Sequence, residues 1–488
     1  MHFPNTRNFT GYFAPTRIEA DITDLETISG EVPAELNGYF HRAAPDPQYA
    51  PKAGDDIWFN GDGLVTAFHV HQGKVDLRQR WVHTDKWKLE RAAGRALFGA
   101  YRNPLTDDPE VQGQIRGTAN TNAMVHAGKL LALKEDSPPV AMDPVTLETE
   151  GYWDFHGTLH APTFTAHPKI DPDTGEMLAF SYAAKGLLTK DIAYYVISPE
   201  GRITKEVWFE LPYYCMMHDF AITKDYVAFH VVPITSSWER LKQGKPHFGF
   251  DTSKDIHLAV LPRNGEASDL RWFRGPNQFA SHVMNAFNEG TKVHFDTPVA
   301  AGNMFPFFPD INDAPFDPEK AQSRMTRWTV DMAANGEEIA VRRLTDLVGE
   351  FPRIDDRFAG RPYRIGYLLV QDRTRPFNGG DSKSATGMIM NTLARIDVET
   401  GERDTYWIGP DSSLQEPCFA PRPGSTEEGD GWLLVVENRL LERRSNLLFF
   451  DGRNLAAGPV AVVAVPFRLR PALHGNWAAA DQISAGSP

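Results

Sequence analysis

The stretch VTAFHVHQGKVDLRQRWV, residues 65–82, holds two runs of apolar and β-branched residues on either side of a turn that contains Gly73. Such runs around a glycine turn are typical of a β-hairpin. The pattern recurs at residues 140–153, 194–209, 257–273, 325–344, 393–408 and 447–465, in turns rich in Gly, Asp, Asn or Pro. Seven predicted hairpins therefore extend along the whole chain.

The residues between successive hairpins leave room for two further strands in each unit, which is the content of one four-stranded propeller blade. Seven such units predict an all-β fold, a seven-bladed β-propeller formed by residues 1–488 as a single domain. A double β-sandwich is the alternative, because any antiparallel β protein repeats hairpins. The best helical pattern covers residues 85–100, which we expect to form a packed surface helix rather than a membrane-contact helix.

The composition is that of a folded globular protein. Of the 488 residues, 41% are hydrophobic and 23% are charged, and the formal net charge is -14 at pH 7. This acidic balance repels phosphate backbones and anionic lipids, so we expect neither a nucleic-acid partner nor a membrane partner. Only Cys215 and Cys418 are present, and the first 17 residues show no basic segment followed by an apolar run. We therefore expect a cytoplasmic protein.

Polar residues interrupt the apolar segments that follow the predicted hairpins. In a propeller, these segments include the strand nearest the central axis, where such folds bind ligands. One histidine or glutamate stands out in each of the seven segments: Glu135, His167, His218, His282, Glu350, Glu416 and His474. Taken alone, each is more often an ordinary core or surface residue. The competing histidines are His69, His71, His126 and His160.

The four histidines of this set predict a metal site. Imidazole is a good ligand for iron, zinc and copper, and four neutral ligands leave the charge of a divalent ion uncompensated. The three glutamates can accept hydrogen bonds from the ligating rings, which orients the rings and raises their basicity. Separations of 51, 64 and 192 residues between successive histidines match no local metal motif. Only a closed repeat fold could bring these histidines together.

Several motifs dispersed along the chain belong to one family pattern. They are FNGDGLVTAFHV at residue 59, GTANTNAMVH at 117, LLALKEDSPPVAMDP at 130, TAHPKID at 165, MHDFAIT at 217, HVMNAFNEG at 282, GEFPRID at 349, EPCFAPR at 416 and LHGNW at 473. With them the chain resembles the carotenoid cleavage oxygenases from end to end, and within them the lignostilbene dioxygenases. The resemblance implies a propeller whose loops and short helices cap one face over the active site.

The resemblance also assigns roles to the histidines and glutamates. It implies one catalytic Fe(II) per chain, bound by His167, His218, His282 and His474. It further implies that the ligating rings are held by Glu135, Glu350 and Glu416. The family places a threonine beside an open coordination position, and the matching residue is Thr121. A simple turn hydroxyl is the alternative role of this threonine.

The stilbene-cleaving branch lines its substrate pocket with a Phe, a Tyr and a Lys, which match Phe59, Tyr101 and Lys134. The resemblance implies that Lys134 and Tyr101 hydrogen-bond the 4-hydroxyl of a stilbene while Phe59 stacks on its ring. A cation lowers the pKa of a nearby phenol, and the resulting phenolate pushes electron density toward the alkene. The alternatives are a solvated strand-end charge for Lys134 and a packed loop aromatic for Tyr101.

We therefore predict a dioxygenase that uses Fe(II) and O2 to cleave the central C=C bond of a 4-hydroxystilbene, such as lignostilbene or resveratrol, into two aromatic aldehydes. A carotenoid or apocarotenoid cleavage oxygenase with the same iron site is the alternative within the family. A non-catalytic propeller that binds partners through its loops is the alternative outside it. The expected partner is the small aromatic substrate. The sequence does not decide between a monomer and a homodimer.

Overall fold

The computed structural model describes residues 2–379 and 390–484. It divides into two compact units, which are described separately below. The first unit contains residues 1–157, 372–394 and 404–488, and the second contains residues 158–371 and 395–403.

The first unit contains three antiparallel sheets built from both ends of the chain. One sheet has the order β1 (Ala20–Ile22), β5 (Lys74–Trp81), β4 (Asp62–His71), β3 (Gly38–Asp46), β34 (Gly475–Ala479). A second has the order β6 (Asn122–His126), β7 (Lys129–Leu133), β8 (Val140–Met142), β9 (Thr149–Tyr152). The third has the order β2 (Thr27–Gly30), β33 (Ala461–Val465), β32 (Arg444–Asp451), β31 (Gly431–Arg439), β29 (Ser412–Leu414), with β30 (Cys418–Pro421) also paired to β31.

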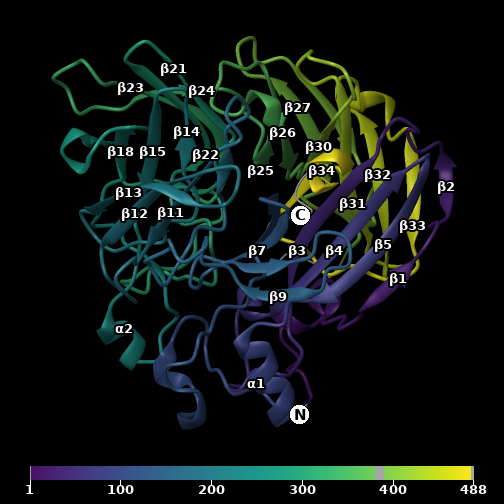
Figure 1. Ribbon diagram of the computed structural model, residues 1–488, viewed down its shortest axis with the longest axis horizontal. Helices are drawn as coiled ribbons and strands as arrows, with labels where there is room; N and C mark the ends of the chain where they lie inside the picture. Colours follow the sequence, from purple (N-terminus) through teal and green to yellow (C-terminus); the bar gives the residue numbers. More distant parts are fainter. Residues whose placement is uncertain (1, 380–389, 485–488) are drawn as a thin grey trace. The chain divides into compact units, whose positions relative to one another are not determined.

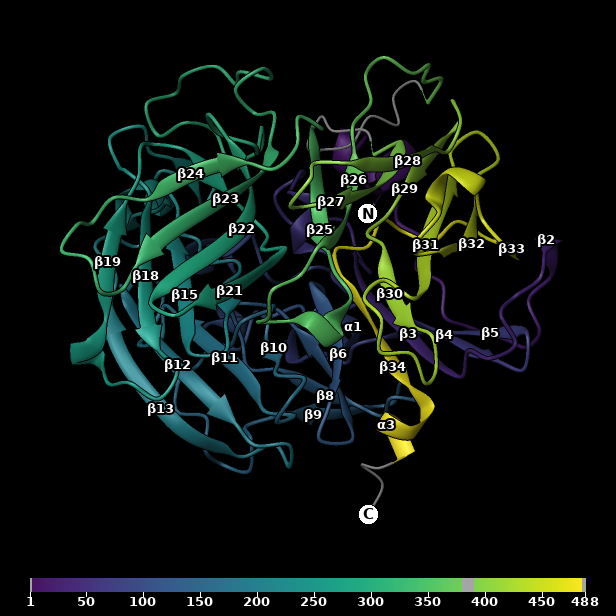
Figure 2. The same ribbon diagram turned by 90° about the horizontal axis from the view of Figure 1, so that it is seen from above.

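The second unit contains three further sheets of four or five strands, some of which are seen side by side in Figure 2. The first has the order β10 (Lys169–Ile170), β11 (Met177–Tyr182), β12 (Asp191–Ile197), β13 (Ile203–Glu210). The next has the order β14 (Ala221–Ile222), β15 (Tyr226–Val231), β18 (His257–Pro262), β19 (Arg271–Arg274). The last has the order β20 (Phe279–Ala280), β22 (Lys292–Ala300), β23 (Arg324–Asp331), β24 (Ala340–Arg343), with β21 (Asn285–Glu289) also paired to β22.

A seventh large sheet has the order β25 (Gly349–Arg353), β26 (Ile365–Val370), β27 (Thr392–Asp397), β28 (Arg403–Trp407). A small two-stranded sheet joins β16 (Ile234–Thr235) to β17 (Gly249–Phe250). The seven predicted hairpins are β4–β5, β8–β9, β12–β13, β18–β19, β23–β24, β27–β28 and β32–β33, one in each large sheet. This confirms the predicted fold class, an all-β seven-bladed β-propeller with one blade per sheet.

The two ends of the chain are joined by strand pairing within the first unit. Strand β34 pairs with β3, so that Trp477 faces Phe40, and β2 pairs with β33. Figure 1 shows the purple strand β2 beside the yellow strand β33. These pairs cover strand edges that would otherwise present open hydrogen-bonding groups.

The surroundings of strand β4 explain why the first hairpin contains an almost continuous apolar run. Successive side chains of a strand point to opposite faces of the sheet. Val65 and Ala67 pack into a core with residues of β6, β7 and β8, whereas Phe68 and Val70 pack into a core with residues of β31, β32 and β33. Both faces of the sheet are therefore buried between neighbouring sheets of the same unit.

Helices are few and short among the described residues: α1 (Asp85–Ala93), α2 (Trp238–Lys242), α3 (Ala480–Ser484) and several 3-10 turns. The predicted helix over residues 85–100 was too long, because Gly94 ends it with a left-handed φ of 67°. Beyond Gly94, the carboxylate of Glu90 accepts hydrogen bonds from the backbone of Leu97 and Phe98. No helix of the described segments has the length and apolar character needed to span a bilayer.

A buried ion pair in the second unit provides a test of the packing. The carboxylate of Asp296 is fully buried and accepts two hydrogen bonds from Arg327, at 2.8 Å each, and one from the Tyr363 hydroxyl. We expect Asp296→Ala to lower the free energy of unfolding by about 3–5 kcal/mol, because it leaves a buried guanidinium without this partner. Urea denaturation followed by circular dichroism measures the change.

Glu399 offers the matched control, since its half-exposed carboxylate accepts a hydrogen bond of 2.8 Å from the same Arg327. Glu399→Ala should cost only about 0–1 kcal/mol. Equal losses in the two variants would contradict the assignment of the stabilisation to the buried pair.

Candidate functional site

Three of the predicted metal ligands lie in the second unit, each beside a short strand at the edge of its sheet. His167 precedes β10, His218 precedes β14, and His282 lies between β20 and β21. These strands lie on the side of each sheet opposite the predicted hairpin. The sequence segments that were searched for ligands therefore do contain the edge strands of these three blades.

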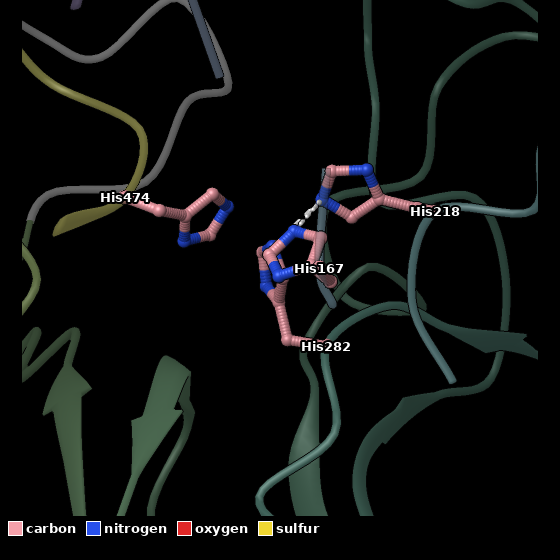
Figure 3. A group of neighbouring side chains, drawn as sticks. All are labelled: His167, His218, His282 and His474. Carbon is pink, nitrogen blue, oxygen red and sulfur yellow. Dashed lines mark hydrogen bonds between the residues drawn. The ribbon is translucent and has the colours of Figure 1, made fainter. Parts of the chain in front are cut away.

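The imidazole rings of His167, His218 and His282 turn their Nε2 atoms toward one another (Figure 3). Nε2 of His218 lies 3.0 Å from Nε2 of His167 and 3.0 Å from Nε2 of His282. Two ligand atoms that bind one ion at about 2.1 Å and at right angles are also about 3.0 Å apart. One ring proton on His218 can serve only one of these two contacts, whereas a shared cation satisfies both. The three rings therefore fit a divalent metal ion.

Glu350 fixes the orientation and tautomer of His282. The ring Nδ1–H of His282 donates to Oε2 of Glu350 at 2.6 Å, so the lone pair of the neutral ring is on Nε2. The same carboxylate accepts hydrogen bonds from the Ser281 hydroxyl and from the backbone of Phe351, whose ring stacks on His282. Burial alone would raise the pKa of Glu350, but His282 and these hydrogen bonds hold it below its usual range.

A buried carboxylate that the sequence analysis did not select, Asp219, joins the three segments that carry these histidines. It directly follows His218 and accepts a hydrogen bond of 2.8 Å from the backbone of Val283, the residue after His282. It also pairs at 2.8 Å with Lys169, two residues after His167. Burial opposes ionisation of Asp219, but Lys169 holds its pKa below the usual range. The motif MHDFAIT contains this aspartate, and its place beside His218 was the available signal.

The fourth predicted ligand, His474, lies in the first unit, directly before β34. Its ring Nδ1–H donates to Oε1 of Glu416 at 2.9 Å, which repeats the arrangement of His282 and Glu350. The backbone N–H of His474 donates to the carbonyl of Thr121 at 3.1 Å. The structure thus brings together three of the predicted residues of the first unit, namely Thr121, Glu416 and His474. Glu135, also predicted, is buried two residues after β7.

The three predicted pocket residues of the first unit also come together. The ammonium of Lys134 donates to the backbone carbonyl of Phe59 at 3.0 Å and lies 5.0 Å from the centre of the Tyr101 ring. The rings of Phe59 and Tyr101 are 6.4 Å apart. Lys134 and Tyr101 are buried, and Phe59 is half-buried. Burial lowers the pKa of Lys134 and raises that of Tyr101.

Asn120 links Thr121 to Lys134 and Phe59 and was also missed by the sequence analysis. Its Oδ1 accepts hydrogen bonds from Lys134 at 3.4 Å and from the Thr121 hydroxyl at 3.0 Å. Its amide nitrogen donates to the backbone carbonyls of Phe59 and Gly61 at 2.9 Å and 2.6 Å. Both oxygens that contact Lys134 are neutral, so they solvate the ammonium without compensating its charge.

Comparisons with known proteins give one consistent family. The sequence model of the family described as "Retinal pigment epithelial membrane protein" matches residues 13–479. Lignostilbene-alpha,beta-dioxygenase isozyme III from Sphingomonas paucimobilis is 54% identical over 486 residues, which cover 99% of each chain. Isoeugenol monooxygenase from Pseudomonas nitroreducens is 44% identical over 97% of this chain and 98% of that protein.

Solved structures agree with these relatives. The crystal structure of lignostilbene dioxygenase from Pseudomonas brassicacearum superimposes with a TM-score of 0.95 and 46% identity, over 98% of this chain and 100% of that chain. A mutant of the Synechocystis apocarotenoid oxygenase gives a TM-score of 0.80 and 26% identity, over 97% and 98% of the two chains.

The position of Asp219 generates a prediction about metal binding. We expect Asp219→Asn to weaken the affinity for a divalent metal by roughly tenfold, because it removes the charge that holds the three histidine segments in register. Titration of metal-free protein against a chelating indicator measures the affinity. The control is Asp225→Asn, which changes a carboxylate paired with Asn288 at 2.7 Å on nearby strand ends. Unchanged affinity in Asp219→Asn would contradict the prediction.

Proposed function

Because the chain belongs to the carotenoid cleavage oxygenase family, we propose that it is a non-haem iron(II) dioxygenase that cleaves the central C=C bond of 4-hydroxystilbenes with O2. The products are two aromatic aldehydes. Each aldehyde carbon receives one oxygen atom, so the reaction consumes one O2 and needs no further reductant. The buried ammonium of Lys134, which lies between the ring of Tyr101 and the carbonyl of Phe59, is the observation that carries the choice of substrate.

We propose one ferrous ion per chain, bound by His167, His218, His282 and His474. The Nε2 contacts of 3.0 Å in the second unit and the His474–Glu416 hydrogen bond in the first support this set. Glu350 and Glu416 fix two of the rings, and we assign Glu135 the same role for a third. A bound ferrous ion would supply the activation of O2. The proposal requires residues 1–488 to act as one propeller domain.

The remaining residues hold the substrate. Lys134 and Tyr101 bind the 4-hydroxyl group of the stilbene, and Phe59 packs on its ring. The ammonium stabilises the phenolate, because a cation favours the charged form of a nearby phenol and both hydrogen-bond partners of Lys134 are neutral oxygens. The phenolate then donates electron density through the conjugated chain to the alkene. Thr121 is proposed to lie beside the open coordination position, where Asn120 orients its hydroxyl.

The relatives favour a phenolic alkene over a carotenoid. The lignostilbene dioxygenase structure has the higher TM-score and identity, at 0.95 and 46%, against 0.80 and 26% for the apocarotenoid oxygenase. Isoeugenol monooxygenase, at 44% identity, makes shorter 4-hydroxyphenyl alkenes a second candidate class. An apocarotenoid or carotenoid substrate at the same iron site is the remaining alternative.

The proposed partner is the small aromatic substrate alone, with no nucleic acid and no membrane. We propose a cytoplasmic location, in keeping with two buried free cysteines and the acidic net charge of -14. We propose a homodimer as the oligomeric state to be tested against a monomer.

The iron assignment predicts the behaviour of a ligand variant. Wild-type protein purified with ferrous iron should contain one iron per chain and cleave a 4-hydroxystilbene, because the four imidazoles complete the site. His167→Ala should lose both the iron and the turnover. Metal analysis and chromatographic detection of aldehydes measure the two outcomes. A binding propeller would show no stoichiometric iron and no difference between the proteins, and turnover of an apocarotenal alone would remove the stilbene assignment.

The proposed role of Lys134 predicts a loss of activity without a loss of iron. Lys134→Met should reduce kcat/KM for 4-hydroxystilbenes by about 100-fold, because the phenolate loses its only proposed cation, while the iron content stays at the wild-type level. A 4-methoxystilbene should be an equally poor substrate for the wild type. Steady-state kinetics measures both effects.

Lys129→Met is the matched control, since Lys129 lies on β7 and pairs with the exposed Glu150. This variant should retain wild-type kinetics. Equal activity of Lys134→Met and wild type on the hydroxystilbene would show that Lys134 does not hold the phenol.

A further inference from the structure

Two histidines and an aspartate form a second cluster on the β4–β5 hairpin of the first unit. His69 and His71 are two positions apart on β4, so their side chains share one face of the sheet. Asp76 on β5 is the register partner of His69. The turn between the two strands brings all three residues onto one surface within eight positions of the sequence.

The donor atoms of this cluster have the spacing of ligands around one ion. Oδ2 of Asp76 lies 3.0 Å from Nε2 of His71 and 3.7 Å from Nδ1 of His69, and the three donor atoms lie within 4.8 Å of one another. In a tetrahedral site with bonds of about 2.1 Å, neighbouring ligand atoms are about 3.4 Å apart. The rings of His69 and His71 stack face to face, so both rings rotate about their side-chain bonds when their in-plane lone pairs turn toward one ion.

Contacts around the cluster hold the ligands in place. The His69 ring stacks between Tyr39, at 4.2 Å, and His71, at 4.3 Å, with interplanar angles of 7° and 21°. The second oxygen of Asp76 accepts a hydrogen bond of 2.8 Å from the backbone of Asp24. Hydrogen bonds of this kind orient ligating carboxylates in metal sites. The carboxylate of Asp76 is thus already oriented before an ion binds.

The charges around the cluster permit a cation. Lys74 pairs with Asp24 at 2.6 Å, and Arg78 pairs with Asp21 at 2.6 Å, so each of these two cations contacts a carboxylate other than Asp76. The side chains of His69, His71 and Asp76 are 27–29% exposed. An ion can therefore enter from solvent and keep water in its remaining coordination positions.

We propose that His69, His71 and Asp76 form a binding site for a divalent transition-metal ion of the zinc class. Two imidazoles and one carboxylate are the ligand types that such borderline ions take in proteins. The site is separate in sequence from the proposed iron ligands and does not depend on the proposed dioxygenase function. A bound ion would link β4 to β5 and, through Asp76, to the backbone of Asp24, two residues after β1.

The test is a count of bound zinc. Purified wild-type protein and the variants His71→Ala and Asp76→Asn are dialysed against the same micromolar Zn2+ buffer, and bound zinc is measured by plasma mass spectrometry. We expect each variant to bind one Zn2+ per chain fewer than wild type while keeping its iron content and stilbene turnover. Added Zn2+ should also raise the melting temperature of the wild type and not that of the variants. Asp76→Asn keeps the shape of the side chain, which guards against a loss by misfolding.

His160→Ala is the matched control, because His160 forms a similar histidine–carboxylate pair with Glu206 at 2.9 Å on an exposed surface. It should bind as much zinc as wild type. Equal zinc content in wild type, His71→Ala and Asp76→Asn would overturn the proposal. Measurements in a His167→Ala background separate the two sites, since that change removes the proposed iron centre and should leave the zinc difference intact.

Discussion

The buried carboxylate of Asp219 joins three chain segments that are far apart in sequence. Through Val283 and Lys169 it connects the residues that flank His218, His282 and His167. A buried charge of this kind is stable only when its partners are in place. The folding of three separate blades is thereby coupled to the position of three imidazoles, and the geometry that fits a metal depends on this coupling.

Carboxylates also orient individual histidine rings. His282 is oriented by Glu350 and His474 by Glu416, with each ring donating from Nδ1 and keeping its lone pair on Nε2. A neutral imidazole with a fixed tautomer is a better ligand than a rotating one. Hydrogen bonds behind the rings therefore decide which nitrogen is offered to a metal.

The surroundings of Lys134 in the first unit follow a different principle. Lys134 is buried beside neutral oxygens of Phe59 and Asn120, and burial lowers its pKa. Its two hydrogen-bond partners are neutral, while the charges of Asp136 and Glu135 oppose part of the effect of burial on its pKa. The hairpin cluster of His69, His71 and Asp76 contrasts with it, because there a hydrogen bond joins His71 to Asp76 and His69 lies 3.7 Å from the same carboxylate.

The amino-acid sequence alone determined the seven hairpins, since the alternation of apolar runs and turns is a local property of the chain. It also led to the proposed metal ligands, because dispersed motifs matched a family pattern. Helix α1 shows the limit of such local patterns: the carboxylate of Glu90 and the left-handed Gly94 turned the chain after Ala93, although the apolar pattern continued. Only tertiary structure could assign roles to Asp219 and Asn120. Both lie inside motifs that carry proposed site residues, but their importance comes from hydrogen bonds to residues that the fold brings close, which no local pattern shows.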